Sequence, residues 1–208
     1  MGTPVTAYQY RFCPASYLHP EQLPSSWRPV IALLPDWRSS GHINGALLEA
    51  LALETDYQAP VGLGAIALLA QPALESLLCR LGLVLHAEAI RHCLQAEPLR
   101  QLMALLEHDA LRQLMARHEL LIGPWPAGWQ SPLPAQIDAS GMIRHGLQFW
   151  LAAMETVPAP WRQRLELRFA PTRQLTPFSL EPSLRPLAQV LCQKLVKQVL
   201  PSCSHLFK

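Results

Sequence analysis

Apolar residues recur along the chain at three- and four-residue spacing, in stretches separated by many of its twenty prolines. This spacing places them on one face of an α-helix, whereas a half-buried strand would show strict alternation. The clearest stretch follows Ser39 or Ser40, either of which can cap a helix, and its apolar positions run from Ile43 to Leu51. Further helices are predicted over residues 73–81, 83–96, 98–107 and 109–121, from Asp138 to the prolines at 158 and 160, and from about Ser183 to Leu200.

The first forty residues carry a different pattern. Prolines at 14, 20, 24, 29 and 35 interrupt them, which predicts helices of one to three turns packed as a cover. Strand signals are thin, since only LELRF at 165–169 alternates, and it also continues the helical pattern before it. The sequence therefore predicts a mainly α fold: one compact multi-helix domain over 1–208, with short proline-bounded helices, an N-terminal cover at 1–40, an amphipathic basic C-terminal helix and tail at 183–208, and at most a minor β element.

Composition adds an expectation of binding partners. Half of the residues are hydrophobic and only 15% are charged, against about a quarter in an average domain. A protein with few charges exposes apolar groups, and large exposed apolar patches mark binding surfaces. The charge is also divided, because residues 1–166 hold 11 basic and 14 acidic groups, whereas residues 167–208 hold 6 basic groups and only Glu181. The C-terminal segment offers positive charge to an acidic protein, an anionic membrane surface or a nucleic acid, or presents an ordinary solvated helix face.

Two segments are predicted to contact partners. The linker GPWPAGWQSPLP at 123–134 contains Trp125 and Trp129, and tryptophan contributes strongly to binding where contact buries it. The alternative is that both tryptophans hold the linker against the core. In the C-terminal helix the predicted contact residues are Arg185, Lys194 and Lys197, although basic residues near a helix C-terminus also suit the helix dipole.

The segment CRLGLVLHAEAIRHC, which starts at Cys79, invites a metal or thiol site. On a continuous helix Cys79, His86 and Cys93 share one face but lie about 10 Å apart per step, too far for one zinc ion. A break in the helix would weaken this objection based on distance. The segment would still lack the closely spaced Cys and His pairs that structural zinc sites normally contain. His86 and Glu88 form H-x-E, yet the P-C-x-x-C partner motif of the zinc deaminases is missing. The cysteines are therefore predicted to be core residues. For the chain as a whole, the sequence predicts no catalytic residue, no cofactor and no metal site.

Short motifs and segments disfavour several other classes. No P-loop, serine-hydrolase or zinc-protease signature occurs, and no RNA-recognition or zinc-finger signature accompanies the basic segment, so no nucleic-acid partner is expected. The uncharged stretch at 57–74 is broken by prolines and glycines and is too short to cross a bilayer, so no direct membrane insertion is expected. The N-terminus lacks a secretory pattern, and five widely spaced cysteines fit a reducing cytosol.

Longer segments of the chain carry a family resemblance. They are RFCPASYLHPEQLP (11–24), LCRLGLVLHAEAIRHC (78–93), HELLIGPWP (118–126), FWLAAME (149–155) and KLVKQVLPSCSHLFK (194–208). These segments resemble the SctK family of bacterial type III secretion proteins, and within it the YscK/PscK branch. The resemblance spans nearly the whole chain and brings no catalytic motif that would assign a role to a residue here.

The resemblance implies a non-enzymatic cytoplasmic adaptor of the injectisome sorting platform, peripheral at its inner-membrane base. Proteins of this family link the cytoplasmic domain of the inner-membrane ring protein SctD to the pod protein SctQ, and so indirectly to the stalk protein SctL and the ATPase SctN. They are needed for assembly and for effector secretion. Two alternatives stay open at this point: an export chaperone that binds secreted substrates, and a Cys/His thiol or metal protein.

Overall fold

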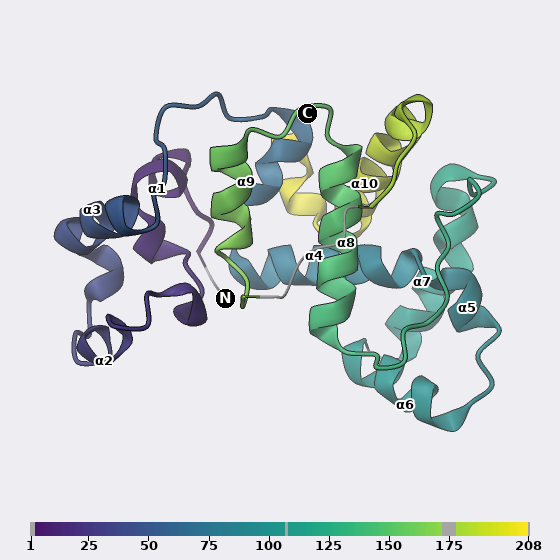
Figure 1. The fold of residues 1–208 in the computed structure, drawn as a ribbon. Helices are drawn as coiled ribbons and strands as arrows, with labels where there is room; N and C mark the ends of the chain where they lie inside the picture. Colours follow the sequence, from purple (N-terminus) through teal and green to yellow (C-terminus); the bar gives the residue numbers. More distant parts are fainter. Residues whose placement is uncertain (1–2, 107, 172–177, 208) are drawn as a thin grey trace. The chain divides into compact units, whose positions relative to one another are not determined.

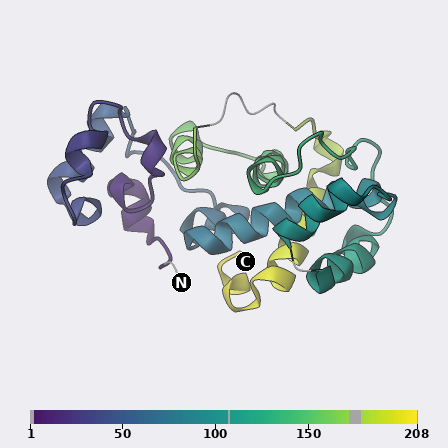
Figure 2. The ribbon, with the colours of Figure 1, turned by 90° about the horizontal axis from the view of Figure 1, so that it is seen from below.

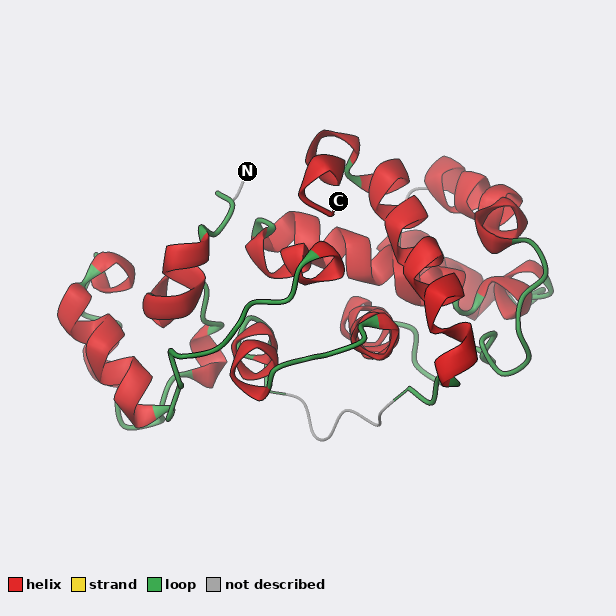
Figure 3. Ribbon diagram, turned by 90° about the horizontal axis from the view of Figure 1, so that it is seen from above, coloured by secondary structure: helices red, strands yellow, loops and turns green. Residues whose placement is uncertain are grey.

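A computed structural model describes residues 3–106, 108–171 and 178–207 of the chain. Helices joined by turns and extended connections make up these residues, and none of them forms a β-strand (Figure 3). The predicted mainly α fold is therefore confirmed. The α-helices are α1 (Ala7–Phe12), α2 (Arg28–Ile31), α3 (Gly41–Ala50), α4 (Gln71–Val84), α5 (Ala87–Arg91), α6 (Ala96–Leu105), α7 (His108–Ile122), α8 (Ala139–Ala153), α9 (Ala159–Glu166) and α10 (Arg185–Val199).

The chain folds into two compact units that interleave along the sequence. Unit 1 contains Met1–Leu74, Thr156–Leu175 and Phe207–Lys208, and unit 2 contains Glu75–Glu155 and Thr176–Leu206. The helices α1 to α3 and α9 belong to unit 1, and α5 to α8 and α10 belong to unit 2, while α4 begins in the first unit and continues in the second. A single domain over residues 1–208 stays a prediction.

Short helices build the N-terminal part of unit 1, as the prolines predict. Figure 2 shows the purple and blue helices α1, α2 and α3 gathered together. Ser40 caps α3, because its hydroxyl accepts a hydrogen bond from the backbone N–H of Ile43 at 3.4 Å. A buried cluster of apolar residues joins these segments to one another: Ala15, Leu18, Leu23, Ile31, Leu47, Leu53 and Leu167.

Two arginines lie in the interior of unit 1, although arginine is rarely buried. Arg164, on α9, donates from Nη2 to the carbonyl oxygen of Arg11 at 3.1 Å. Arg168, in the turn after α9, donates to the carbonyl oxygens of Ala67 at 2.9 Å and Leu69 at 2.7 Å. The rigid guanidinium fork supplies several donors at once, so each side chain satisfies backbone carbonyl groups of segments that are distant in the sequence. These contacts fasten the N-terminal segments of unit 1 to α9.

Unit 2 is built around a close crossing of α4 and α8, which is visible in Figure 1. A Cβ atom on Gly82 would lie 2.2 Å from the carbonyl oxygen of Met142, and one on Gly146 would lie 2.1 Å from the carbonyl oxygen of Leu78. No side chain fits into either space. Glycine on both helices therefore lets the two backbones touch.

The same crossing corrects a predicted helix boundary. The sequence predicts separate helices over 73–81 and 83–96, with Gly82 between them, and this is wrong. The helix α4 continues through Gly82 to Val84, and the chain turns at Leu85 and His86 instead. Glycine stands at position 82 because a neighbouring backbone occupies the space of a side chain, and it does not break the helix.

The remaining helices of unit 2 lie close to their predicted bounds. The helix α6 ends at Leu105 and α7 begins at His108, near the predicted break. Asp138 caps α8 as predicted, because its Oδ1 accepts the backbone N–H of Gly141 at 2.7 Å. The helix α10 begins at Arg185, shortly after its predicted start.

Two further expectations concern strands and membranes. In the LELRF segment, α9 continues to Glu166 and the next residues form a turn, so the strand alternative does not occur there. Among the helices that the structure describes, none is both long and apolar enough to span a bilayer.

Candidate interaction surface

The C-terminal helix α10 turns an apolar face inward and leaves a basic face exposed. It packs against α7 and α8, and its buried residues are Ala188, Leu191, Cys192, Leu195 and Val196. Gln189 fixes it against α8 by donating from Nε2 to the carbonyl oxygen of Ala153 at 3.1 Å. Lys194 and Lys197 are exposed and form no ion pair with any residue that the structure describes. Their ammonium groups are therefore accessible to an acidic partner.

Arg185, the third predicted contact residue of this helix, occupies a different environment. It begins α10, where the helix dipole disfavours a positive charge. The side chain is half-buried, and its Nε atom is buried without a hydrogen-bond partner among the described residues. A buried donor without an acceptor costs about 1–3 kcal/mol. Arg185 thus differs in burial from the two lysines, and its role in binding stays a prediction.

The two tryptophans of the linker 123–134 also differ in burial. Trp129 is only 2% exposed and packs edge-to-face on Phe149 of α8, with ring centroids 5.0 Å apart. Trp125 is half-buried, stacks on His118 of α7 at 6.2 Å and meets Trp129 at 6.3 Å. Such ring contacts stabilise a core by about 0.5–1.5 kcal/mol each beyond area burial. Trp129 therefore fits the alternative in which the linker is held against the core, and part of Trp125 remains accessible.

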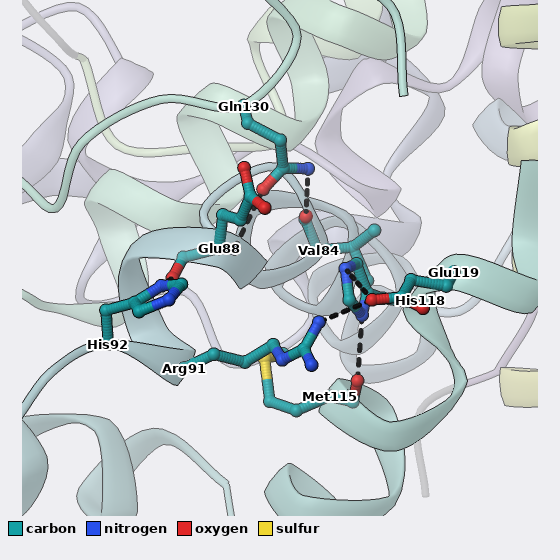
Figure 4. Close-up of polar contacts among 8 residues, drawn as sticks. All are labelled: Val84, Glu88, Arg91, His92, Met115, His118, Glu119 and Gln130. Atoms are coloured by element: carbon teal, nitrogen blue, oxygen red, sulfur yellow. Dashed lines mark hydrogen bonds and ion pairs between the residues drawn. The ribbon is translucent and has the colours of Figure 1, made fainter. Parts of the chain in front are cut away.

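Hydrogen bonds fix the linker to the turn between α4 and α5 (Figure 4). Gln130 bridges the two helices, because its Oε1 accepts the backbone N–H of Glu88 at 3.0 Å and its Nε2 donates to the carbonyl oxygen of Val84 at 3.0 Å. Ser131 donates its backbone N–H to the carbonyl oxygen of Leu85 at 2.9 Å. Helix ends leave such groups without intrahelical partners, so the linker serves as a cap for both helices.

A pair of histidines lies beside this junction. His86 is 5% exposed and places Nδ1 3.0 Å from the carbonyl oxygen of Ser131, with Nε2 2.9 Å from Nδ1 of His145. The carbonyl group requires a proton on Nδ1 of His86, so Nε2 accepts the N–H of His145 and both rings are neutral. Burial lowers the pKa of His86, and burial together with the neighbouring His86 lowers the pKa of His145 to about 4. His86 is thus a hydrogen-bonded core residue.

Sequence reasoning missed this pair because its members are far apart in the chain. His145 lies 59 residues after His86, and no local motif connects the two positions. Cys79 lies on α4 and Cys93 follows α5, so the segment that contains His86 spans two helices and the turn between them. In the part of the chain that the structure describes, no three His, Cys, Asp or Glu residues are grouped to hold a metal ion.

An ion pair holds α5 against α7 below the linker, as Figure 4 shows. Nη1 of Arg91 lies 2.5 Å from Oε1 of Glu119, and both side chains are substantially exposed. His118, one residue earlier, is buried and hydrogen-bonds through Nδ1 to the carbonyl oxygen of Met115 at 2.8 Å. Exposed ion pairs contribute about 0–1 kcal/mol, so the packing of His118 and Trp125 holds this region more firmly than the charges do.

Fewer basic residues of the C-terminal segment 167–208 are exposed in the described structure than its sequence suggests. Arg168 is buried in unit 1, and Arg173 and Lys208 lie outside the described residues. Among the described residues, the exposed positive charge of this segment is therefore that of α10. No described hydrogen bond or ring contact joins α10 to the Trp125 linker, although both pack on α7 and α8.

Comparisons with known proteins cover nearly the whole chain. The family model described as "YOP proteins translocation protein K (YscK)" matches residues 4–208. Two relatives called "Yop proteins translocation protein K", from Yersinia enterocolitica and Yersinia pseudotuberculosis serotype I, are each 58% identical over 204 residues, covering 98% of this chain and 98% of the relative. The solved cytoplasmic domain of the T3SS sorting platform protein PscK from P. aeruginosa matches with a TM-score of 0.81 and 36% identity, over 98% of this chain and 99% of that one.

Proposed function

Because the chain belongs to the YscK family of type III secretion proteins, we propose that it is a non-enzymatic adaptor of the secretion sorting platform. In this role it links the cytoplasmic domain of SctD to the SctQ pod, and so indirectly to SctL and the SctN ATPase. It acts in the cytoplasm, peripheral at the inner-membrane base of the injectisome, and is needed for assembly and effector secretion. The observation that carries the proposal is the whole-length match in fold to the sorting platform protein PscK.

The exposed face of α10 is the leading contact surface in this proposal. Lys194 and Lys197 lie one turn apart on the helix and have no described intramolecular partner, so a bound carboxylate would not compete with an existing ion pair. The opposite face of the helix is packed on α7 and α8, which fixes the position of the backbone that carries the two lysines. We assign this face to one of the two partners, and the accessible part of Trp125 to a second contact.

Charge reversal tests the assignment of α10. In pull-downs with purified SctD cytoplasmic domain and SctQ, the double variant Lys194→Glu/Lys197→Glu should bind one partner at least about tenfold more weakly, since charged pairs across an interface contribute on the order of 1 kcal/mol or more each. Binding to the other partner should be unchanged. The control variant Arg117→Glu reverses an exposed charge on α7 and should bind both partners normally.

Other outcomes would count against the proposal. If the folded double variant binds both partners like the unaltered protein, α10 is not a contact surface. If the unaltered protein binds neither SctD nor SctQ but binds secreted substrates stably, it is an export chaperone instead of an adaptor.

A further inference from the structure

An uncharged apolar tip projects from unit 1 between two Trp-Arg pairs. Residues 27–38 read WRPVIALLPDWR, so the stretch from Pro29 to Pro35 contains no charged or polar side chain and is flanked by a tryptophan and an arginine on each side. It forms the one-turn helix α2 and the turn that follows it. Neither the family assignment nor the proposed contacts of α10 account for this pattern.

The apolar side chains of the tip point away from the core of unit 1. Leu33 is 81% exposed, Val30 is 60% exposed and Leu34 is 44% exposed, while only Ile31 reaches the buried cluster. Single exposed apolar residues are ordinary, but a continuous exposed run on one short segment marks a contact surface.

The base of the tip is held firmly by its flanking residues. Trp27 and Trp37 are partly buried and pack against the hydrophobic cluster of unit 1. Arg28 donates from Nε to the carbonyl oxygen of Leu23 at 3.2 Å, and the guanidinium of Arg38 lies 4.4 Å from the centre of the Trp37 ring. The tip is therefore presented on a fixed support.

Both arginines keep donors for an external ligand. Arg28 uses Nε and Nη2 to bind backbone carbonyl groups, and Arg38 uses only Nη1, at 2.8 Å from the carbonyl oxygen of Ala15. A guanidinium group carries five N–H donors. Nη1 of Arg28 and Nη2 of Arg38 form no described hydrogen bond, and so each is able to bind a phosphate group.

We propose that residues 27–38 dock unit 1 on the surface of a phospholipid bilayer. The apolar tip enters the outer edge of the acyl region, while Trp27, Trp37 and the two arginines lie at the level of the headgroups, where tryptophan and arginine are typically found at membrane surfaces. A Trp-Arg pair on each side fits a segment that enters and leaves the interface at one depth, with the exposed Asp36 at its edge. A fluid bilayer accepts exposed side chains such as Leu33 and Val30 without a preformed groove, whereas a protein partner would need a groove that fits them.

This contact is shallow and does not span the membrane. The tip is seven residues long and a helical span needs about twenty, so the proposed contact lies at the surface of the bilayer. A few exposed apolar side chains give weak and reversible attachment, of the order of a single acyl chain or less. Arg28 and Arg38 are balanced by the exposed Glu21 and Asp36, so attachment rests on apolar burial and depends little on salt.

Vesicle flotation of the full chain tests the proposal. The unaltered protein should float with phosphatidylcholine vesicles, with or without phosphatidylglycerol, and should remain bound in high salt. Leu33→Asp should reduce the bound fraction at least about fivefold, because a carboxylate is excluded from the apolar region. The matched control Leu120→Asp alters a leucine on α7 of unit 2 that is 76% exposed, and it should float like the unaltered protein.

Three outcomes would overturn the proposal. The first is that the unaltered protein does not float, and the second is that Leu33→Asp floats equally well. In the third, binding needs phosphatidylglycerol and disappears in high salt, which would assign it to Lys194 and Lys197. If Leu33→Asp loses a protein partner while the unaltered chain never binds vesicles, the tip docks on a protein. None of these results depends on the pull-downs that test the adaptor function.

Discussion

The two units of this protein achieve burial by different means. Unit 1 joins short, proline-bounded helices and irregular segments, and its interior polar groups are satisfied by arginine side chains that donate to backbone carbonyls. Unit 2 consists of longer helices, and at the crossing of α4 and α8 the two backbones touch at Gly82 and Gly146. In unit 2 two regular helices approach closely where both lack a side chain, whereas in unit 1 long polar side chains enter the core and donate to backbone carbonyl groups.

The largest effect is expected from filling the helix crossing of unit 2. Gly146→Ala places a Cβ atom 2.1 Å from the carbonyl oxygen of Leu78, so the helices must separate along their length. We expect the free energy of unfolding to fall by about 3–4 kcal/mol, measured by urea denaturation. The control Gly45→Ala on α3 meets no atom within 4 Å and should stabilise α3 by up to about 1 kcal/mol. Equal effects of the two changes would show that backbone contact does not define unit 2.

A slightly smaller effect is expected from removing a buried guanidinium in unit 1. Arg164→Met keeps the volume but leaves the carbonyl group of Arg11 without its side-chain donor, which should cost about 2–3 kcal/mol. Hydrogen exchange should show the loss of protection in unit 1 first. Arg162→Met is the control, because Arg162 is exposed and its described ion pair is with Glu166 across one turn, and it should cost less than about 1 kcal/mol.

The smallest effect is a difference in acid sensitivity between the units. His145 and His86 have pKa values below the ordinary value of 6.5, with His145 at about 4, so the unfolded chain binds more protons than the folded one between these limits. Their contribution is complete above pH about 6.5 and is lost as the pH falls toward about 4. Because the His145 ring is partly solvated, we expect unit 2 to lose about 1 kcal/mol between pH about 7 and about 5.

A substitution separates this effect from general acid denaturation. His145→Asn retains an N–H donor toward His86 but does not titrate, and it should reduce the slope of stability against pH. His42→Asn, at an exposed position on α3, should leave that slope unchanged. If hydrogen exchange shows unit 1 opening before unit 2 in mild acid, the histidine pair does not set the acid sensitivity.

Local signals predicted the regular parts of the fold well. The caps at Ser40 and Asp138 and the apolar spacing behind them are properties of a few neighbouring residues, and the structure confirms the helices that follow. The boundary predicted at Gly82 was wrong because this glycine makes room for the backbone of Met142 on α8, and only the tertiary structure reveals that neighbour. At the observed boundary both helix ends are capped by Gln130, which lies 46 residues after Val84 and 42 residues after Glu88.

The candidate contact residues also differ in whether the local sequence is able to predict their exposure. An exposed helix face follows from spacing alone, and Lys194 and Lys197 lie on it. Whether a tryptophan in a proline-rich linker faces solvent depends on a partner elsewhere in the chain, and Phe149 buries Trp129. The buried arginines could not be predicted for the same reason, since Arg164 binds a carbonyl group 153 residues earlier in the chain and Arg168 binds two that lie 101 and 99 residues earlier.

The long reach of Arg168 sets an order of events during synthesis. Its carbonyl partners on Ala67 and Leu69 leave the ribosome 101 and 99 residues before it does. At about 5–20 residues per second, the nascent segment waits on the order of 5–20 s for its fastening side chain. During that interval the helices α4 to α8 emerge and are able to pack, while the leucines of unit 1 remain accessible to chaperones. The N-terminal segments of unit 1 thus wait for a residue that follows α4 to α8, and unit 2 is completed only when α10 has emerged as well.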